Sequence, residues 1–164
     1  GDTKCKKVVE ELGFDGCIDY KNANLVRELK TLCPEGVDLY FDNVGVTVLE
    51  AVLIRMKNRG RKVSSGAESQ YESPSPIGPR NIPGFIITKR LKLEGFIVMD
   101  FKERHLEAIT HMKKLFNDGK ITIIEDITEG LQSAPEALVN LLNGKNFGKS
   151  MVRVTPDPTR PKLS

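Results

Sequence analysis

Short apolar stretches alternate with amphipathic segments of helical length along most of this chain. Apolar residues at positions 5, 8, 9 and 12 have the spacing of one helix face, and Gly13 can end that helix. Helices are expected at 3–12, 25–32, 48–56, 102–116 and 133–142, a short apolar piece at 17–20, and strands at 37–42, 61–65, 92–99, 121–127 and 150–154. Such alternation is typical of βαβ units, so the sequence predicts an α/β fold with a parallel sheet.

Proline-rich sequence interrupts this alternation twice. Pro74, Pro76, Pro79 and Pro83 fall between residues 66 and 84, in a stretch also rich in Ser and Gly. Loops of this length inside a domain are usually lids, binding loops or disorder, and prolines hold a loop extended, which favours a shaped cover. The tail from residue 155 has three further prolines and is expected to be disordered or loosely packed.

Composition excludes several classes of protein. The chain has 39% hydrophobic residues and 25 basic against 22 acidic residues, a net charge of +3, which is unlike a wholly disordered protein. No apolar run reaches the roughly 20 residues that span a bilayer, and the basic residues form no stripe of the kind that binds nucleic acid. The chain opens on Gly1 with no Met and no apolar core after its first charges, which predicts a cut end rather than a signal peptide.

The cysteines and histidines give no metal-site pattern. Cys5, Cys17 and Cys33 form no CxxC pair and are odd in number, so we interpret them as buried or half-buried thiols of a reducing compartment, the cytoplasm. His105 and His111 are six residues apart and would lie on different faces of a helix. No metal is therefore expected.

Glycine-rich phosphate-binding motifs are missing from this sequence. Neither GxGxxG nor GxxxxGK[ST] occurs, although dinucleotide-binding domains use such a turn to bring backbone N–H groups to the pyrophosphate. If the fold binds a nucleotide, its first strand and phosphate turn would precede Gly1. Arrangements for Ser-His-Asp, Cys-His or paired-carboxylate catalysis are also lacking.

Several short motifs, in order, resemble one family of reductases. They are Lys4-Cys5, ELGFD at 11–15, DYK at 19–21, CPEGVDLYFDNVG at 33–45, GAESQY at 66–71 and GKNFGK at 144–149. This series is similar to the prostaglandin reductases, zinc-independent members of the medium-chain dehydrogenase/reductase superfamily. These enzymes reduce the carbon–carbon double bond of α,β-unsaturated ketones with NADPH. The resemblance runs from Lys4 to about residue 154.

The resemblance implies a division of the chain into three parts. Residues 1–118 would be the later part of an NADP-binding Rossmann domain, a doubly wound parallel sheet without its first strand and glycine-rich turn. Residues 119–154 would be the C-terminal segment that returns to the catalytic domain, and 155–164 a Pro-rich tail. The chain would thus be a C-terminal fragment.

The resemblance implies that two residues near the N-terminus determine whether NADP or NAD is bound. Lys4 would follow the second Rossmann strand, where a cation holds the 2′-phosphate of NADP and an acid would hold the ribose of NAD. Together with the Tyr20 hydroxyl, the Lys4 ammonium favours binding of NADP(H) over NAD. The nearby acidic residue Asp2 departs from this preference for a cation beside the 2′-phosphate. From the residues alone, Lys4 is a solvated helix residue and Tyr20 a half-buried residue at a strand end.

The resemblance implies that residues at the ends of two predicted strands contact the nicotinamide half of the cofactor. Asn43 follows strand 37–42 at the carboxyl edge of the sheet, where a side-chain amide can bind ribose or phosphate oxygens. In the same turn, Val46 replaces a glycine that is usual in the family and that would allow the backbone to approach the cofactor closely. Backbone groups of 65–71 would meet the cofactor, and the Tyr71 phenol would donate to the substrate carbonyl or the nicotinamide ribose as the catalytic residue. The expected cofactor contacts here are Ser65, Gly66, Ala67, Glu68, Ser69, Gln70 and Tyr71, with Glu68 an unusual carboxylate among them.

Further cofactor contacts are implied at Phe96, Ile97, Val98 and Asn146. From sequence alone the first three are a buried strand, and Asn146 is a loop residue after the helix stop at Gly144.

The activity implied is NADPH-dependent reduction of enones and enals of the 15-keto-prostaglandin type, by hydride transfer to the β-carbon. Alternatives are a quinone oxidoreductase of the same superfamily and a non-catalytic truncated nucleotide-binding module. Expected partners are a small enone or lipid substrate and a second copy through the edge strand near Phe96, with no nucleic acid and no membrane.

Overall fold

The structure is a computed structural model that describes residues 1–71 and 78–156. It divides into two compact units, residues 1–108 and residues 109 onward, and the division falls inside helix α5 (His105–Asn117). Each unit is described separately. The predicted domain boundary at 118/119 follows the end of this helix and stays a prediction.

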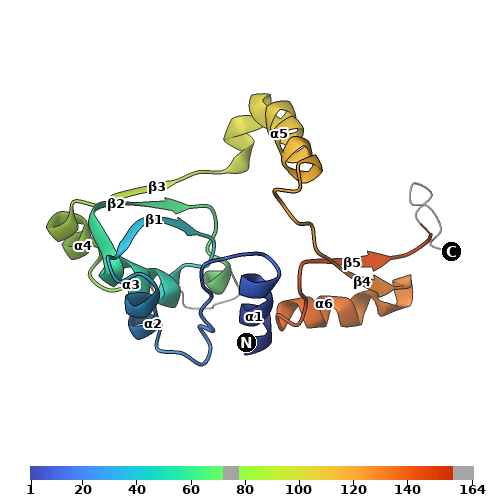
Figure 1. The fold of residues 1–164 in the computed structure, drawn as a ribbon, viewed down its shortest axis with the longest axis horizontal. Coiled ribbons are helices and arrows are strands. Elements are labelled where there is room, and N and C mark those ends of the chain that lie inside the picture. The colour runs from blue at the N-terminus through green and yellow to red at the C-terminus, as the bar shows by residue number, and fades with distance from the viewer. Residues whose placement is uncertain (72–77, 157–164) are drawn as a thin grey trace. The chain divides into compact units, whose positions relative to one another are not determined.

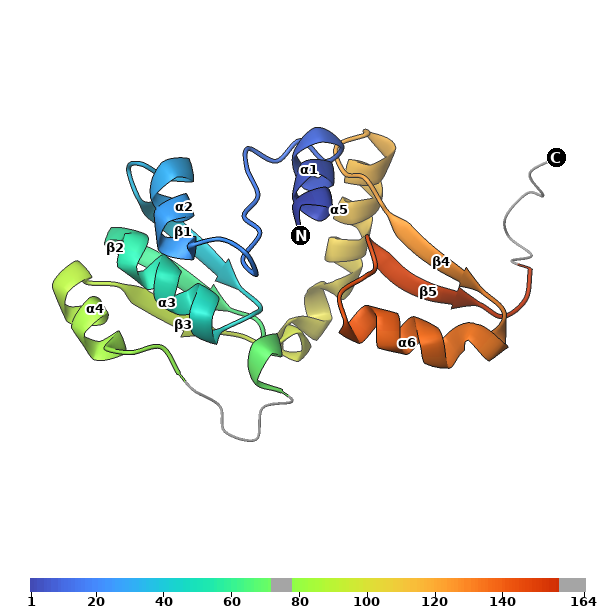
Figure 2. The same ribbon diagram turned by 90° about the horizontal axis from the view of Figure 1, so that it is seen from below.

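The first unit contains a parallel three-stranded sheet in the order β1 (Val37–Asp42), β2 (Met56–Ser64), β3 (Lys92–Gly95). Helices α3 (Val46–Arg55) and α4 (Ile82–Lys89) connect the strands. They lie with α2 (Leu25–Leu32) on one face of the sheet (Figures 1 and 2). The predicted α/β class with a parallel sheet is confirmed.

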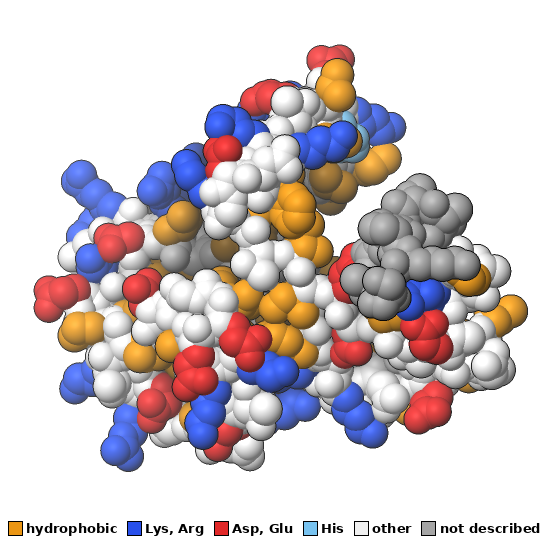
Figure 3. Space-filling view, turned by 45° about the vertical axis from the view of Figure 1, so that its right-hand side comes forward, with side chains coloured by type: hydrophobic (Ala, Val, Ile, Leu, Met, Phe, Trp, Pro, Cys, Tyr) orange, Lys and Arg blue, Asp and Glu red, His pale blue; other side chains and the backbone are white. Residues whose placement is uncertain are grey.

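The hydrophobic core of this unit lies between the sheet and α3. Its buried members are Leu49, Val52, Leu53, Met56 and Leu91. Tyr40 of β1 packs against this core from the same face of the sheet, whereas its neighbours Leu39 and Phe41 are exposed. Many other large apolar side chains are also exposed, as the orange surface in Figure 3 illustrates.

Helix α1 (Asp2–Glu10) and the segment that follows it fold back on each other. Gly13 has a left-handed φ of 71°, which reverses the chain, and Phe14 N–H donates to the Val8 carbonyl at 3.4 Å. The N-terminal amine of Gly1 lies 3.3 Å from Asp19 Oδ1. Residues 14–19 therefore run antiparallel to the helix.

The second unit is a single βαβ element. Strands β4 (Glu125–Glu129) and β5 (Lys149–Arg153) pair in parallel, and α6 (Ala134–Leu142) connects them. Ala137 is the one fully buried residue in α6. Three short 3-10 helices complete the described elements: η1 (Glu68–Gln70), η2 (Val98–Arg104) and η3 (Leu131–Ser133).

Several boundaries differ from those predicted. Residues 17–20 form no strand, and β2 begins at Met56, which was expected to end a helix. β3 stops at Gly95 because Ser64, the last residue of its neighbour β2, pairs with Gly95. Strand β4 begins four positions later than the predicted 121.

The Pro-rich regions are described only in part. Residues 72–77 of the predicted cover and 157–164 of the tail lie outside the described residues. Beyond this gap, Pro83 stands in the first turn of α4, where its missing N–H costs no hydrogen bond. In the ranges 1–71 and 78–156, every helix is too short or too polar to cross a bilayer.

Candidate active site at the carboxyl edge of the sheet

Two connections lie side by side where β1 and β2 end. They are the turn 42–45, which leads into α3, and the loop 65–71, which follows β2. Ser65 and Gly66 N–H both donate to the Asp42 carbonyl, at 2.8 and 3.3 Å. Glu68 N–H donates to Asn43 O at 3.0 Å and Ser69 N–H to Val44 O at 3.1 Å. Parallel α/β sheets bind their ligands at this edge.

The backbone N–H groups of residues 65–70 all donate hydrogen bonds within the first unit. Gln70 N–H donates to the Ala67 carbonyl at 2.8 Å, and Ala67 N–H donates to the Tyr71 hydroxyl at 3.1 Å. With the four bonds above, each N–H from 65 to 70 has an acceptor inside the first unit. The expectation that backbone groups of this loop meet a ligand is therefore restricted to its carbonyl groups.

Asp42 anchors the turn from a fully buried position. Its side chain is 1% exposed, and Oδ1 accepts from Tyr40 Oη at 2.8 Å, Val44 N at 3.0 Å and Gly45 N at 2.9 Å. Burial by itself would raise the pKa of Asp42, but the donors from Gly45, Lys62 and Tyr40 outweigh it and hold the pKa below its ordinary value. Burial and the Asp42 carboxylate together raise the pKa of Tyr40.

Lys62 supplies the cation of the same cluster. It is 7% exposed, and its Nζ lies 3.0 Å from Asp42 Oδ2 and donates to Ser64 Oγ. The strand register explains the grouping, since Tyr40 pairs with Lys62 and Asp42 with Ser64. All four side chains thus lie on one face of the sheet.

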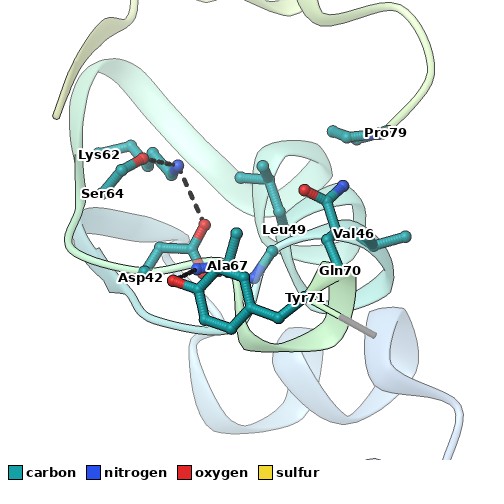
Figure 4. Close-up of a pocket in the computed structure, with 11 residues that line it drawn as sticks. Asp42, Val46, Leu49, Lys62, Ser64, Ala67, Gln70, Tyr71 and Pro79 are labelled. Atoms are coloured by element: carbon teal, nitrogen blue, oxygen red, sulfur yellow. Dashed lines mark hydrogen bonds and ion pairs between the residues drawn. The ribbon is translucent and has the colours of Figure 1, made fainter. Parts of the chain in front are cut away.

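A cavity of about 440 Å³ opens beside this cluster. In Figure 4, Lys62 and Ser64 stand on one wall and Val46, Gln70 and Pro79 on the other. Leu49 and Ala67 add apolar surface. The cavity combines a few polar groups with apolar walls, which is the usual composition of a small-molecule site.

Tyr71 also lines this cavity, and its side chain is 71% exposed. Its hydroxyl oxygen accepts the Ala67 N–H, which uses a lone pair and not the proton. The phenol can therefore still donate a hydrogen bond to an acceptor in the cavity. Gly66 allows this packing, because a Cβ there would lie 3.1 Å from Asn43 O and 3.5 Å from Tyr71 Oη.

Eight of the predicted site residues come together at this edge, in the turn and loop just described. They are Asn43, Ser65, Gly66, Ala67, Glu68, Ser69, Gln70 and Tyr71. Four of them, Gly66, Ala67, Gln70 and Tyr71, line the cavity. Glu68 is exposed, and Ser69 Oγ donates to the Val44 carbonyl at 2.5 Å, so Ser69 serves the loop's own structure.

Helix α1 and the returning residues 14–20 form a hairpin in the first unit, the α1 hairpin, which carries both Lys4 and Tyr20. Lys4 is half-buried in the first turn of α1, and Tyr20 is 57% exposed in the segment after it. The predicted half-buried strand end for Tyr20 is wrong, because residues 17–20 have no partner strand among the described residues.

The segment after β3 is not the buried strand that was predicted for Phe96, Ile97 and Val98. The Phe96 ring packs between those of Phe41 and Phe101, with centroid separations of 6.3 and 5.8 Å. Ile97 and Val98 are 62% and 61% exposed, so the predicted buried strand is wrong there.

Asn146 belongs to the second unit. Its Nδ2 donates to the Gly148 carbonyl at 2.9 Å, which stabilises the loop before β5. It lines a polar cavity of about 140 Å³ together with Asp126, Lys145 and Ser150.

Sequence reasoning missed Asp42 and Lys62 as site residues. A weak signal existed at Asp42, a carboxylate at the end of the mostly apolar strand β1, whereas Lys62 lies among the other basic residues of β2 and has no such signal. Val46 was singled out only for replacing a glycine. Its φ of 34° lies in the left-handed region, which a β-branched residue rarely adopts, so the position carries backbone strain.

Comparisons with known proteins agree with this architecture. The NADPH-dependent curcumin reductase of Escherichia coli is 38% identical over 162 residues, which make up 96% of this chain and 47% of that protein. Prostaglandin reductase 1 of Rattus norvegicus is 40% identical over 147 residues, 88% of this chain and 45% of that protein. The chain thus spans less than half the length of these curated relatives.

The crystal structure of CurA in complex with NADPH from Vibrio vulnificus matches with a TM-score of 0.85 and 38% identity, over 96% of this chain and 48% of that one. A family model described as "Zinc-binding dehydrogenase" matches residues 2–114. Within 1–71 and 78–156, no three His, Cys, Asp or Glu side chains are grouped so as to hold a metal ion. The model match and the relatives together show that the chain belongs to the zinc-binding dehydrogenase family of the medium-chain dehydrogenase/reductase superfamily.

Proposed function

We propose that this chain forms the cofactor-binding part of an NADPH-dependent oxidoreductase that reduces the carbon–carbon double bond of α,β-unsaturated ketones and aldehydes. The similarity to NADPH-bound CurA over nearly the whole chain carries the proposal. The names of two relatives, a curcumin reductase and a prostaglandin reductase, agree with it. The activity proposed is that of the whole protein.

The residues of the first unit fit NADPH in chemical type. The ammonium of Lys4 and the exposed phenol of Tyr20 are suitable partners for the dianionic 2′-phosphate, which NADH lacks. The Asn43 amide would donate or accept hydrogen bonds at the nicotinamide half, and the carbonyl groups of loop 65–71 would accept them. By resemblance, Phe96, Ile97 and Val98 are further cofactor contacts of this unit, and Asn146 of the second unit is proposed as a cofactor contact on the resemblance alone. NADPH, when bound, supplies the hydride for the β-carbon of the substrate.

Tyr71 is the proposed catalytic residue. Its O–H can donate to the substrate carbonyl oxygen, which becomes enolate-like as the β-carbon gains a hydride. The hydrogen bond from Ala67 N–H to its oxygen supports this role, because it fixes the ring and makes the phenol a better donor. Solvent would then protonate the α-carbon.

The substrate class is proposed more finely as 15-keto-prostaglandins, since the motif series most resembles prostaglandin reductase 2. A quinone oxidoreductase is the second candidate. Turnover of the whole protein with 15-keto-prostaglandin, a short enal and a quinone distinguishes them, and preference for the quinone would reject the prostaglandin assignment.

Titration of the 164-residue chain with NADPH and NADH tests cofactor binding directly. We expect tighter binding of NADPH, and we expect Lys4→Ala to weaken NADPH but not NADH. Lys6→Ala, on the exposed side of the same helix, is the matched control. No binding of either nucleotide would favour the alternative of a non-catalytic module, and equal binding of both would reject the 2′-phosphate assignment.

In the whole protein, Tyr71→Phe should lower the turnover of enones, because the substrate carbonyl loses its proposed donor. Full activity of this variant would remove Tyr71 from the proposed chemistry.

Two further assignments belong to this proposal. A second copy is proposed to pair along the outer edge of β3, where Phe96 stands beside exposed apolar residues, and size-exclusion chromatography of Phe96→Glu tests it. A cytoplasmic location is proposed because the three cysteines are free thiols.

A further inference from the structure

Two of the three cysteines face each other across the α1 hairpin. Cys5 lies on α1 and Cys17 on the returning segment, and their thiols share a side-chain hydrogen bond. Contacts on either side agree with this pairing, since Gly1 meets Asp19 at one end and Val8 meets Phe14 at the other. Gly1 and Val8 are four residues before and three residues after Cys5, on the same side of the helix, so these two contacts bring the returning segment alongside Cys5.

The two thiols differ in exposure. Cys17 is exposed, contrary to the expectation that the cysteines are buried or half-buried, whereas Cys5 is half-buried. Cys33, at the end of α2, is half-buried and is not part of the pair. An oxidant therefore reaches Cys17 first, and the nearest second sulfur belongs to Cys5.

We propose that Cys5 and Cys17 are a redox modification site at which hydrogen peroxide forms an intramolecular disulfide. Peroxide oxidises the Cys17 sulfur to a sulfenic acid and releases one water molecule. The Cys5 sulfur then attacks the Cys17 sulfur, the S–S bond forms, and the hydroxyl leaves with a proton as a second water. Each sulfur loses one electron, and each peroxide oxygen gains one.

The order of these steps follows from the exposure of Cys17, and the protonation of Cys5 agrees with it. The hydrogen bond to Cys17, and then burial, raise the pKa of Cys5 to about 11. Cys5 therefore remains a thiol at neutral pH and serves as the resolving residue, which attacks only after Cys17 has been oxidised.

The disulfide would also affect cofactor choice, a step that rests on the proposed function. Lys4 precedes Cys5, and Tyr20 is three residues after Cys17, so the bond would fix the two proposed 2′-phosphate ligands relative to each other. Fixing a site in its bound arrangement reduces the ordering cost of binding. Oxidation should thus tighten NADPH and leave NADH unchanged.

Peroxide treatment of the chain, followed by tryptic digestion and mass spectrometry, tests the site itself. Trypsin places the three cysteines on separate peptides, residues 5–6, 8–21 and 31–55. We expect residues 5–6 to be cross-linked to 8–21, with 31–55 still carrying a free thiol. Cys33→Ser should form the same cross-link, and Cys5→Ser and Cys17→Ser should form none.

A cross-link to residues 31–55, a cross-link between two chains, or Cys17 sulfinic acid without any cross-link would overturn the assignment. The disulfide is measured without any nucleotide, so its failure is distinct from failure of NADPH binding. Where NADPH binds, an equal change in affinity for NADPH and NADH on oxidation would reject the link to cofactor choice.

Discussion

The buried ion pair of Asp42 and Lys62 makes the sharpest prediction about stability. Lys62→Met would leave the Asp42 carboxylate, 1% exposed, without its cation. Loss of one partner from a buried ion pair costs about 3–5 kcal/mol. The three neutral donors on Asp42 Oδ1 remain, so the expected loss in the free energy of unfolding is at the lower end, about 3 kcal/mol.

Urea unfolding followed by circular dichroism measures this loss. Adding Asp42→Asn to Lys62→Met should restore about 2 kcal/mol, because the amide keeps Oδ1 for the three donors and removes the unpaired charge. Lys92→Met is the matched control, since the Lys92–Glu94 pair is exposed and should matter little. The reasoning is refuted if Lys62→Met costs no more than Lys92→Met, or if the double variant is as unstable as the single one.

Three further predictions concern the same turn and helix α2. The folded pKa of Asp42 lies below its unfolded value of about 3.9, so its stabilisation is present above that pH and is lost as pH falls through the folded pKa. The loss in the free energy of unfolding caused by Lys62→Met should therefore be smaller at about pH 3 than at about pH 7, because the unpaired Asp42 carboxyl becomes neutral in acid. An equal loss at both pH values in urea titrations would contradict this. Val46→Gly should stabilise the chain by about 1 kcal/mol in thermal unfolding by relieving a φ of 34°, and destabilisation would show that the valine packing outweighs the strain. Asn24→Ala should cost about 1 kcal/mol in urea unfolding, because the Asn24 side chain accepts from Arg27 N–H at the start of α2, and an unchanged midpoint would disprove the capping role.

Local signals in the sequence predicted much of the fold. Gly13 was predicted to end the first helix, and it stands shortly after the end of α1 with a left-handed φ. Strand 37–42 has its predicted bounds because its apolar run is closed by a turn. Such features depend on residues close in the chain, which a pattern can capture.

The features that escaped prediction depend on which strands are neighbours. Nothing local to Lys62 shows that it pairs with Tyr40 and shares a face with Asp42, since only the register brings them together. The apolar run from Phe96 continues the strand pattern, yet β3 ends where β2 no longer accompanies it. At the site, Asn43 and the loop 65–71 were predicted from strand ends, whereas their mutual hydrogen bonds required the tertiary structure.

The engaged amides of loop 65–70 have a kinetic consequence. Four of the six, those of Ser65, Gly66, Glu68 and Ser69, donate to carbonyl groups of the turn 42–45, so these four should exchange with deuterium as one cooperative group when the turn and loop separate. A ligand that uses the carbonyl groups or the Tyr71 phenol can associate without that opening. A ligand that requires one of the amides must wait for the separated state, and its association rate would be reduced by the fraction of time the loop is open.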